Sequence, residues 1–455
     1  MPTATQLRRD ALAIWQAGVD SVLADRLLER EVQIDGQWLL VGDQEFDLEP
    51  VGRIVVVGAG KAGAAMARGL ESALGPQLLA EKQVEGWVNV PAGTVTPTTA
   101  IHLHPSRPAG VNEPRPEGVE GSRQILNLVS SLAPNDLCLC LLSGGGSALL
   151  PAPSAGVSLA EKIAITRLLS GSGATIDQLN AVRRQLSDIK GGGLARACTA
   201  SQLVTLVISD VLGDPLETIA SGPTYPTKAG PEEAMQVLTE LELLEHPDPV
   251  SIVEFLRRRL ETGPHSPTPA IAELHHVILA NNATAVDAAG IEAERRGYNH
   301  AMDCATSSEG PAEDVGRHLA SMALSMRDTP GGPNCLITGG EPTVKLVASD
   351  QRGLGGRNQQ LVLAAIQELG NCQGIALLSG GTDGEDGPTD AAGAFVDEQV
   401  IRQAQAGSLS AADYLARNDA YHYFEPLQSL IKTGPTGTNV CDLRVLVVDQ
   451  QPKAK

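Results

Sequence analysis

Short aliphatic runs that alternate with helical patterns constrain the fold of this chain more than any other feature of its sequence. The runs are about 4–8 residues long and almost wholly apolar, which is typical of strands buried on both faces of a parallel sheet. In the first half they are residues 54–57, 84–90, 137–142 and 203–208. A second series follows at residues 276–280, 335–338, 375–379 and 444–448. The alternation predicts an α/β fold with helices on both faces of a mainly parallel sheet.

The length of the chain, 455 residues, is too great for one compact core, so at least two domains are expected. Residues 225–270 become helical and polar and end in the proline-rich stretch ETGPHSPTPA. We therefore predict a Rossmann-like domain over residues 1–245 and a second α/β domain over residues 270–455. Apolar residues on helical spacing also predict one long opening helix over residues 4–29.

Charge and composition exclude several classes of partner. The formal net charge is −20, from 34 Lys and Arg against 54 Asp and Glu, and only 3% of the residues are aromatic. Such a field repels nucleic acids and anionic membranes, and few rings are available to stack on bases. The chain has no run of eighteen apolar residues, and its 7 Cys are scattered without the spacing of a metal site. We expect a cytoplasmic protein without nucleic-acid or membrane partners, with any anionic substrate bound by a local cluster of cations.

A glycine-rich turn follows the first aliphatic run. Residues 58–63 read G-x-G-x-x-G and lead into a helical pattern. A dinucleotide-binding motif would place Asp or Glu at the end of the next strand, but the sequence there is Asn89-Val90-Pro91. Lys61 stands in the first turn of the expected helix, where backbone N–H groups and the helix dipole already favour an anion. Gly58, Gly60 and Lys61 are therefore predicted to contact a phosphoryl group or a carboxylate.

Three of the aliphatic runs end in paired glycines, which allow backbone N–H groups to approach an anion closely. The alternative is that each pair only makes a tight turn between strand and helix. The first of these segments, LLSGGGSALL, is predicted to cradle an anion through Ser143, Gly144, Gly145, Gly146 and Ser147.

A polar stripe borders the buried face of a helical pattern over residues 175–190. It consists of Asn180, Arg183, Ser187 and Lys190, and three glycines follow at 191–193. The stripe is either part of a binding site or a solvated helix face. A little further on, Asp210 follows the run at 203–208, and the end of a strand is a usual place for a general base or a Mg²⁺ ligand, whereas Asp214-Pro215 is equally consistent with a simple turn.

The second half contains three further polar segments. Glu341 follows a glycine pair, and a glycine-rich loop delivers Arg357 and Asn358 to the start of a helix, where a planar guanidinium suits a phosphate. The segment TDGEDGPTD then groups carboxylates at residues 383–390. Asp383, Asp386 and Asp390 are either ligands of a metal ion or members of a solvated acidic turn.

Taken together, the motifs resemble the glycerate 2-kinase family, whose members carry an N-terminal kinase domain and a C-terminal MOFRL domain. The resemblance extends over about residues 5–450. The motifs that carry it are VVGAGKAGAAMA, LLSGGGSALL, LNAVRRQLSDIKGGGLA, ISDVLGDPLETIASGPT, TGGEPTV, GLGGRNQQLVLA, SGGTDGEDGPTDAAGA and TGPTGTNVCDL. It implies ATP-dependent phosphorylation of D-glycerate at the 2-hydroxyl with Mg²⁺. It also implies a mixed sheet in the second domain and an active site in a cleft between the domains.

Within this resemblance, Lys61 and Arg357 match active-site residues of the family, and with Asp210 they form the expected catalytic set. The expected contacts to ATP and D-glycerate come from Gly58, Gly60, Ser143–Ser147, Asn180, Arg183, Lys190, Glu341 and Asn358, and those to Mg²⁺ from Asp383, Asp386 and Asp390. Two departures from the family pattern stand out: residues 104–115 replace a short G-H-P-x-P-D segment, and Cys441 stands where Asn is common. An NAD(P)H-dependent hydroxypyruvate reductase and a non-catalytic sensor of sugar acids or nucleotides are the alternatives, and we expect a monomer or a small homo-oligomer.

Overall fold

A computed structural model describes residues 3–108, 110–111, 113–246, 250–262, 273–370 and 372–450. These residues form two compact units. Unit N is built from residues 24–279, and unit C from residues 1–23 together with residues 280–455. The opening helix therefore belongs with the second half of the chain, although a continuous domain over residues 1–245 had been expected. The proline-rich stretch at 263–270, on which the expected boundary rests, lies outside the described residues.

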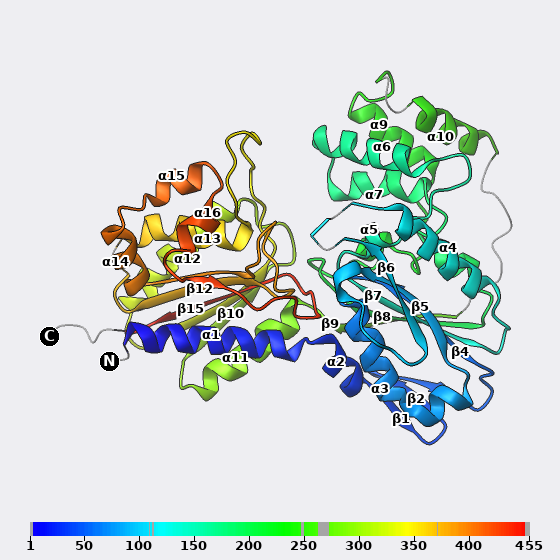
Figure 1. Ribbon diagram of the computed structural model, residues 1–455, viewed down its shortest axis with the longest axis horizontal. Coiled ribbons are helices and arrows are strands. Elements are labelled where there is room, and N and C mark those ends of the chain that lie inside the picture. Colours follow the sequence, from blue (N-terminus) through cyan, green and yellow to red (C-terminus); the bar gives the residue numbers. More distant parts are fainter. Residues whose placement is uncertain are drawn as a thin grey trace. The chain divides into compact units, whose positions relative to one another are not determined.

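Unit N is organised around a six-stranded sheet in the order β6-β5-β4-β7-β8-β9 (Figure 1). Its strands are β4 (Ile54–Ala59), β5 (Glu85–Pro91), β6 (Ile101–Arg107), β7 (Leu137–Ser143), β8 (Gln202–Ile208) and β9 (Glu273–Ala280). Strands β6, β5, β4, β7 and β8 pair in parallel. Every residue of β4 and β7 is buried, as expected for strands covered on both faces.

Helices cover both faces of this sheet. Helix α3 (Gly63–Glu81) approaches Val88 and Val90 of β5 at Gly63, whereas α4 (Pro116–Ser130) approaches Asn89 at Gly121. Successive side chains of a strand point to opposite faces, so the two helices lie on different sides of the sheet. The predicted α/β class with a Rossmann-like parallel sheet is confirmed.

Unit N also contains elements that the aliphatic runs did not reveal. An antiparallel meander is formed by β1 (Val32–Asp35), β2 (Trp38–Val41) and β3 (Gln44–Asp47), and α2 (Ala24–Glu31) precedes it. A separate apolar core is shared by α6 (Leu159–Gly171), α7 (Ile176–Gln185), α9 (Pro231–Glu240) and α10 (Val250–Thr262). Short turns of helix complete the unit: η1 (Ala92–Thr94), α5 (Gly146–Leu149), α8 (Gly193–Ala197) and η2 (Ile219–Ser221).

Unit C contains a second six-stranded sheet, in the order β10-β11-β15-β12-β13-β14. Its strands are β10 (His300–Cys304), β11 (Cys335–Gly340), β12 (Ile375–Gly381), β13 (Gly393–Asp397), β14 (Leu430–Ile431) and β15 (Asp442–Val448). Strands β10 and β11 pair in parallel and the other neighbours pair antiparallel. The expected mixed sheet is confirmed.

Helix α1 (Ala4–Ser21) packs on the sheet of unit C. The indole Nε1 of Trp15 donates to the carbonyl of Gly380 in β12 at 3.3 Å. The expected helix over residues 4–29 is therefore two helices, because the chain leaves helical geometry at Val22 and resumes as α2 in unit N. Figure 1 shows α1 and α11 (Asn282–Arg295) below this sheet and α12 (Ala312–Arg327) and α13 (Arg357–Leu369) above it. The shorter helices are α14 (Glu398–Ala406), α15 (Ala411–Ala416) and α16 (Ala420–Phe424).

Within the described ranges, no helix is long and apolar enough to cross a membrane.

Candidate functional sites

The glycines that precede Lys61 are explained by packing within the sheet. A Cβ atom at Gly58 would collide with the carbonyl oxygen of Leu141, and one at Gly60 would collide with Ser143. The Lys61 N–H donates to the carbonyl of Gly144 at 2.8 Å, and the Ala62 N–H donates to Ser143 Oγ at 3.0 Å. The backbone around Lys61 is thus fixed against the end of β7, and Gly58, Gly60 and Ser143 contribute to that junction.

The side chain of Lys61 lies beside Gly145 in the glycine loop after β7. A Cβ built on Gly145 would be 3.2 Å from Cγ of Lys61 and 3.3 Å from Nη2 of Arg107. Gly145 itself has a φ of 75°, which favours glycine. Two cationic side chains therefore meet at this loop. Arg107 was not predicted; the one signal was its place in the segment 104–115 that departs from the family pattern.

A dense polar cluster surrounds Ser147, in the turn that follows. Nζ of Lys190 lies 2.6 Å from Ser147 Oγ and donates to the Ser147 carbonyl at 2.8 Å. A guanidinium N–H of Arg183 also donates to Ser147 Oγ. Ser221 Oγ lies 2.8 Å from Ser147 Oγ and donates to Asn180 Oδ1 at 3.0 Å. We call Ser147, Asn180, Arg183, Lys190 and Ser221 the Ser147 cluster.

A strained loop holds Ser221 in this cluster. Ala220, Ser221 and Gly222 have φ values of 51°, 65° and 63°, so two non-glycine residues in succession occupy the left-handed region. Such backbone costs on the order of 1–3 kcal/mol per residue and is concentrated at functional sites. The loop is tied to the glycines after Lys190, because the N–H groups of Gly191 and Gly192 donate to the carbonyls of Ser221 and Gly222 at 3.0 and 2.7 Å.

The predicted polar stripe is brought together only in part. Helix α7 ends at Gln185, so Ser187 and Lys190 lie beyond the helix on which the stripe was placed. Asn180, Arg183 and Lys190 converge on the Ser147 cluster, whereas Ser187 Oγ donates to the carbonyl of Ala152 at 3.2 Å. Ser221 was missed, although it stands in the quoted segment ISDVLGDPLETIASGPT.

The Ser147 cluster is rich in positive charge. Burial lowers the pKa of Lys190 well below its usual value, and the nearby charge of Arg183 lowers it further. Burial also lowers the pKa of Arg183. Within the part of the chain that the structure describes, no carboxylate forms an ion pair with Arg183 or Lys190. A buried lysine and a half-buried arginine without a carboxylate partner are a suitable environment for an anionic ligand.

Lys162 provides a test of this electrostatic environment. It is buried, its Nζ donates to the carbonyl of Leu186 at 2.9 Å, and burial together with Arg183 lowers its pKa to about 7. The folded protein therefore binds fewer protons at Lys162 than the unfolded chain between about pH 7 and 10.5.

We expect the free energy of unfolding to rise with pH in that window, by at most about 1.4 kcal/mol per pH unit from this group. The measurement is urea unfolding at several pH values on the wild type and on Lys162→Met, which lacks the titrating amine. Parallel pH profiles of the two proteins would contradict the expectation.

Asp210 lies just beyond β8, at the same carboxyl edge of the sheet as Lys61 and Ser143, and it is partly exposed. Its position is consistent with the predicted role at a strand end. The interpretation of Asp214-Pro215 as a turn also has support, because Asp214 has a φ of 55° and its N–H donates to the carbonyl of Val211 at 3.0 Å.

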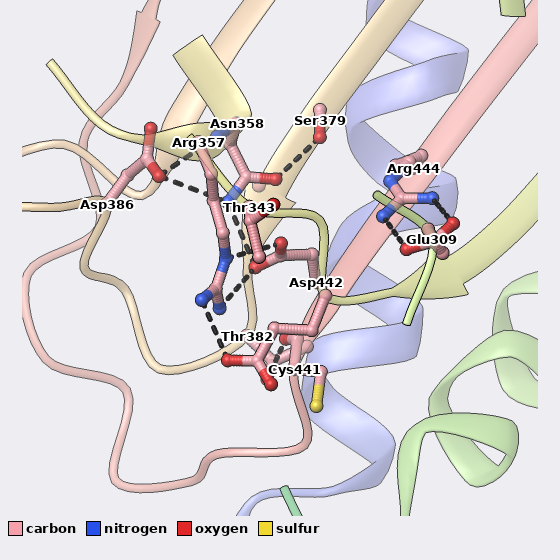
Figure 2. Close-up of polar contacts among 12 residues, drawn as sticks. Glu309, Thr343, Arg357, Asn358, Ser379, Thr382, Asp386, Cys441, Asp442 and Arg444 are labelled. Atoms are coloured by element: carbon pink, nitrogen blue, oxygen red, sulfur yellow. Dashed lines mark hydrogen bonds and ion pairs between the residues drawn. The ribbon is translucent and has the colours of Figure 1, made fainter. Parts of the chain in front are cut away.

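In unit C, the guanidinium of Arg357 is held by two carboxylates. Its Nε and Nη2 donate to the two oxygens of Asp442 at 2.7 and 3.0 Å, and Nη1 donates to Glu341 at 2.7 Å. Figure 2 shows Arg357 and Asn358 turned toward Asp442, whose side chain is fully buried. Burial by itself would lower the pKa of Arg357, but Asp442 and Glu341 outweigh it and raise the pKa well above its usual value. The guanidinium of Arg357, which was expected to hold a phosphate, thus holds the carboxylate of Asp442. Asp442 was not among the predicted site residues.

The start of α13 is occupied by Asp386. One of its oxygens accepts the backbone N–H of Asn358 at 3.0 Å (Figure 2), and the other accepts the backbone N–H of Gln359 at 2.9 Å. Burial raises the pKa of Asp386 to about 7, although these N–H groups oppose the shift. Gly356 is required here because a Cβ would collide with Asp386. A carboxylate of the protein therefore occupies the N-terminus of the helix that begins at Arg357.

The glycine pair after β11 also makes room for side chains of unit C. A Cβ at Gly339 would collide with the amide of Asn282, and one at Gly340 would collide with Glu309. Glu309 forms a two-point ion pair with Arg444, with both contacts at 2.7 Å (Figure 2). At this position the interpretation as internal packing explains both glycines.

The three carboxylates predicted to bind a metal have separate partners. Asp386 caps α13, Asp390 accepts from Lys432 and Tyr421 at 2.9 and 2.8 Å, and Asp383 accepts the Glu385 N–H at 3.0 Å. Among the described residues, no group of three or more His, Cys, Asp or Glu side chains is arranged to hold a metal ion. The structure therefore does not bring Asp383, Asp386 and Asp390 together as a metal site.

Cys441, next to Asp442, occupies the left-handed region with a φ of 67° and is buried. Asn tolerates this region better than Cys, and Asn is the residue that the family resemblance suggests here. We expect Cys441→Asn to raise the free energy of unfolding by about 1 kcal/mol, measured by thermal or urea unfolding.

The matched control for Cys441→Asn is Cys335→Asn. Cys335 is also buried but lies in the extended strand β11, so the same substitution there should lower stability. A loss of stability in both variants would show that relief of backbone strain at Cys441 is not the dominant effect.

Comparison with known proteins identifies the class of these two α/β units. Residues 10–257 match the family described as "Domain of unknown function (DUF4147)", and residues 334–442 match the MOFRL family. The chain is 36% identical to "Glycerate kinase" of Rattus norvegicus, covering 99% of this chain and 95% of that protein. It is 35% identical to "D-glycerate 2-kinase" of Thermotoga maritima, covering 96% and 97%.

A crystal structure of glycerate kinase from Thermotoga maritima has the same fold, with a TM-score of 0.80, 32% identity, and coverage of 98% of this chain and 100% of that one. A protein of Agrobacterium vitis named "Putative hydroxypyruvate reductase" is also similar, at 38% identity over 88% of this chain and 100% of that protein. The chain belongs to the glycerate kinase family, with an N-terminal DUF4147 domain and a C-terminal MOFRL domain.

Proposed function

We infer that the protein is a glycerate 2-kinase, which transfers the terminal phosphoryl group of ATP to the 2-hydroxyl of D-glycerate. The family and its full-length relatives support a kinase that acts on a hydroxyl group. The observation in this chain that carries the proposal is the Ser147 cluster, in which Arg183 and Lys190 converge without a carboxylate partner among the described residues. ATP and D-glycerate are both anions, and the phosphoryl group that is transferred between them also carries negative charge.

The cations of unit N suit the electrostatic needs of phosphoryl transfer. The reaction involves little covalent chemistry for the protein and depends on positioning and on stabilising charge on the transferring group. We propose that Lys61, beside Gly145, neutralises that group, with Arg107 as its neighbour. Asn180, Arg183 and Lys190 hold an anionic part of a substrate, and Ser143–Ser147 shape the loop against which it lies. Asp210, at the carboxyl edge of the sheet, orients the acceptor hydroxyl.

We also propose that residues of unit C act on a substrate. Arg357, Glu341 and Asn358 form one hydrogen-bonded group with Asp442, so they act on a substrate as an assembly in which Arg357 is already oriented. A Mg²⁺ ion is expected for a kinase that uses ATP. Asp386 and Asp390 do not fit that role because their oxygens accept hydrogen bonds from backbone N–H groups, a lysine and a tyrosine.

The experiment that tests the function measures ADP formation by the purified protein with D-glycerate, ATP and Mg²⁺. Phosphorus NMR of the product then distinguishes 2-phosphoglycerate from 3-phosphoglycerate. A parallel reaction with hydroxypyruvate and NADH or NADPH measures the alternative activity. We expect ADP and 2-phosphoglycerate; consumption of the reduced nicotinamide without ADP formation would overturn the proposal.

The name of the Agrobacterium vitis relative is what favours a reductase as second candidate. The end of β5 argues against it, because a dinucleotide-binding fold carries a carboxylate there to bind the ribose. In this chain Asn89 stands at that place, and its amide contacts Trp87 at 3.2 Å and the carbonyl of Leu149 at 2.8 Å. Kinase activity is therefore better supported.

Cytoplasmic location and a monomeric or small homo-oligomeric state stay predictions. Cell fractionation tests the first, and light scattering on the purified protein tests the second.

A further inference from the structure

We propose that Ser147 is a covalent phosphoryl carrier, which accepts the γ-phosphoryl group of ATP and passes it to glycerate. The inference rests on the proposed kinase function and goes beyond it, because direct transfer from ATP to glycerate requires no nucleophile on the protein. It rests on the geometry and the charge of the Ser147 cluster.

The hydroxyl of Ser147 is placed as a nucleophile. Ser147 is partly exposed, whereas its partners Ser221 and Lys190 are buried behind it. Ser221 uses its own hydroxyl hydrogen on Asn180 Oδ1, so the hydrogen of Ser147 is directed to Ser221 Oγ at 2.8 Å. Lys190 Nζ donates to Ser147 Oγ at 2.6 Å, and at this distance the neutral amine is placed to take the Ser147 proton. A serine in contact with a second serine and a lysine is an arrangement that activates the first hydroxyl.

Lys190 is the group that can take the proton from Ser147. Its charged neighbours are Arg183, Lys162 and Arg184, all of them cations, and it is buried. Both effects lower the pKa of Lys190 and favour the neutral amine, which can act as a base. Arg183 cannot accept a proton, but its N–H donates to Ser147 Oγ and stabilises negative charge on that oxygen.

The same charges suit the phosphorylated form of Ser147. A phosphoserine carries a charge of about −1.5 to −2 and offers three acceptor oxygens, which are stabilised opposite a group of cations. Arg183 and Lys190 already contact Oγ, and neither forms an ion pair with a carboxylate in the described part of the chain. Such surroundings favour an anionic phosphoryl group on Ser147 over a neutral acyl group.

The reaction balances in two steps. In the first step, Ser147 Oγ attacks the γ-phosphorus, the bond from that phosphorus to the β–γ bridging oxygen breaks, and ADP leaves with the bonding pair. The hydroxyl proton of Ser147 passes to Nζ of Lys190. In the second step, the 2-hydroxyl oxygen of glycerate attacks the phosphoserine, and the bond between phosphorus and Ser147 Oγ breaks. Lys190 then returns its proton to Ser147, and the proton of the glycerate hydroxyl goes to solvent.

The test is a rapid-quench reaction of the full-length protein with γ-³²P-labelled ATP in the absence of glycerate. We expect label on the protein, located on Ser147 by peptide mass spectrometry, and its complete transfer to phosphoglycerate when unlabelled D-glycerate is added. Exchange of labelled ADP into ATP without glycerate is expected for the same reason.

Three variants sharpen the test. Ser147→Ala should lose the label and the exchange, with kcat lowered by at least about 10³-fold. Lys190→Arg places a permanent positive charge at this position and cannot take a proton, so it should label much more slowly than the wild type while its melting temperature reports on folding. Ser172→Ala, an exposed serine in the same unit, should label like the wild type.

The outcomes separate this inference from the proposed function. ADP and phosphoglycerate formed without any labelled protein or ADP–ATP exchange would overturn the phosphoserine and leave the kinase intact. Label that glycerate does not discharge would also overturn it. Absence of ADP formation with glycerate present would overturn the kinase function, and with it the basis of this inference.

Discussion

Replacing Lys61 with alanine is expected to lower kcat by about 10²–10⁴-fold, the range for loss of a key electrostatic group in a transition state. The side chain of Lys61 lies with Arg107 beside Gly145, in the loop that leads to Ser147. Its removal takes away one of the positive charges that offset charge on the transferring phosphoryl group. Because the backbone N–H of residue 61 bonds to Gly144 whatever the side chain, folding should be preserved.

The measurement is steady-state kinetics with glycerate and ATP varied separately, together with a thermal melt. Lys228→Ala is the matched control, because Lys228 is exposed in the same unit. Its substitution removes one positive charge from the chain, as Lys61→Ala does. Near-normal turnover of Lys61→Ala would show that Lys61 has a structural role. An equal loss in Lys228→Ala would point to the net charge of the protein as the cause.

Replacing Arg357 with lysine is expected to lower the free energy of unfolding by about 2–3 kcal/mol. Lysine keeps the charge but offers one point contact where Arg357 makes two bonds to Asp442 and one to Glu341. The Asp442 carboxylate is fully buried, so a lost bond leaves it poorly compensated. One third of the Arg357 side chain is exposed, which keeps the expected loss below that of a completely buried pair.

Urea unfolding measures this loss, and kcat/KM for each substrate, measured well below the melting temperature, reports on catalysis. Arg352→Lys is the matched control because Arg352 is exposed in the preceding loop and bonds to one carbonyl, that of Val347. Unchanged stability of Arg357→Lys would contradict the role assigned to its ion pair. A fall in kcat/KM in addition to the loss of stability would support the predicted contact of Arg357 with the phosphates, and an unchanged kcat/KM would remove it from the reaction.

The class of fold could be predicted because burial leaves a local signature. Strands β4 and β7 are apolar at almost every position since both faces of the sheet are covered, and such runs stand out in any sequence. The meander of β1, β2 and β3 left no such signature, because its strands have four residues each and several exposed positions. The opening helix was predicted too long, because the periodicity of α1 continues into α2 although the chain passes from unit C to unit N between them.

Candidate site residues could be predicted only where charged or amide residues stand beside glycines or along the border of an apolar helix face. The pattern of Asn180, Arg183 and Lys190 indicated a polar stripe, and the structure brings these three together around Ser147. Their meeting depends on the end of α7 at Gln185 and on the strained loop at Ser221. Neither feature follows from helical periodicity.

The sequence by itself determined three things: the alternation of strands and helices, the glycine turns at strand ends, and membership of the family. Each of them depends on short contiguous motifs and on the order of those motifs along the chain. The tertiary structure alone decided which groups meet. Arg357 bonds to Asp442, which is 85 residues away in the chain, and Asp386 occupies the helix start at Asn358. It also assigned Gly339 and Gly356 to packing against side chains of their own unit. Hydrogen bonds and close contacts between distant segments depend on how the elements pack, and that packing is set by the whole core, so no local pattern could have revealed them.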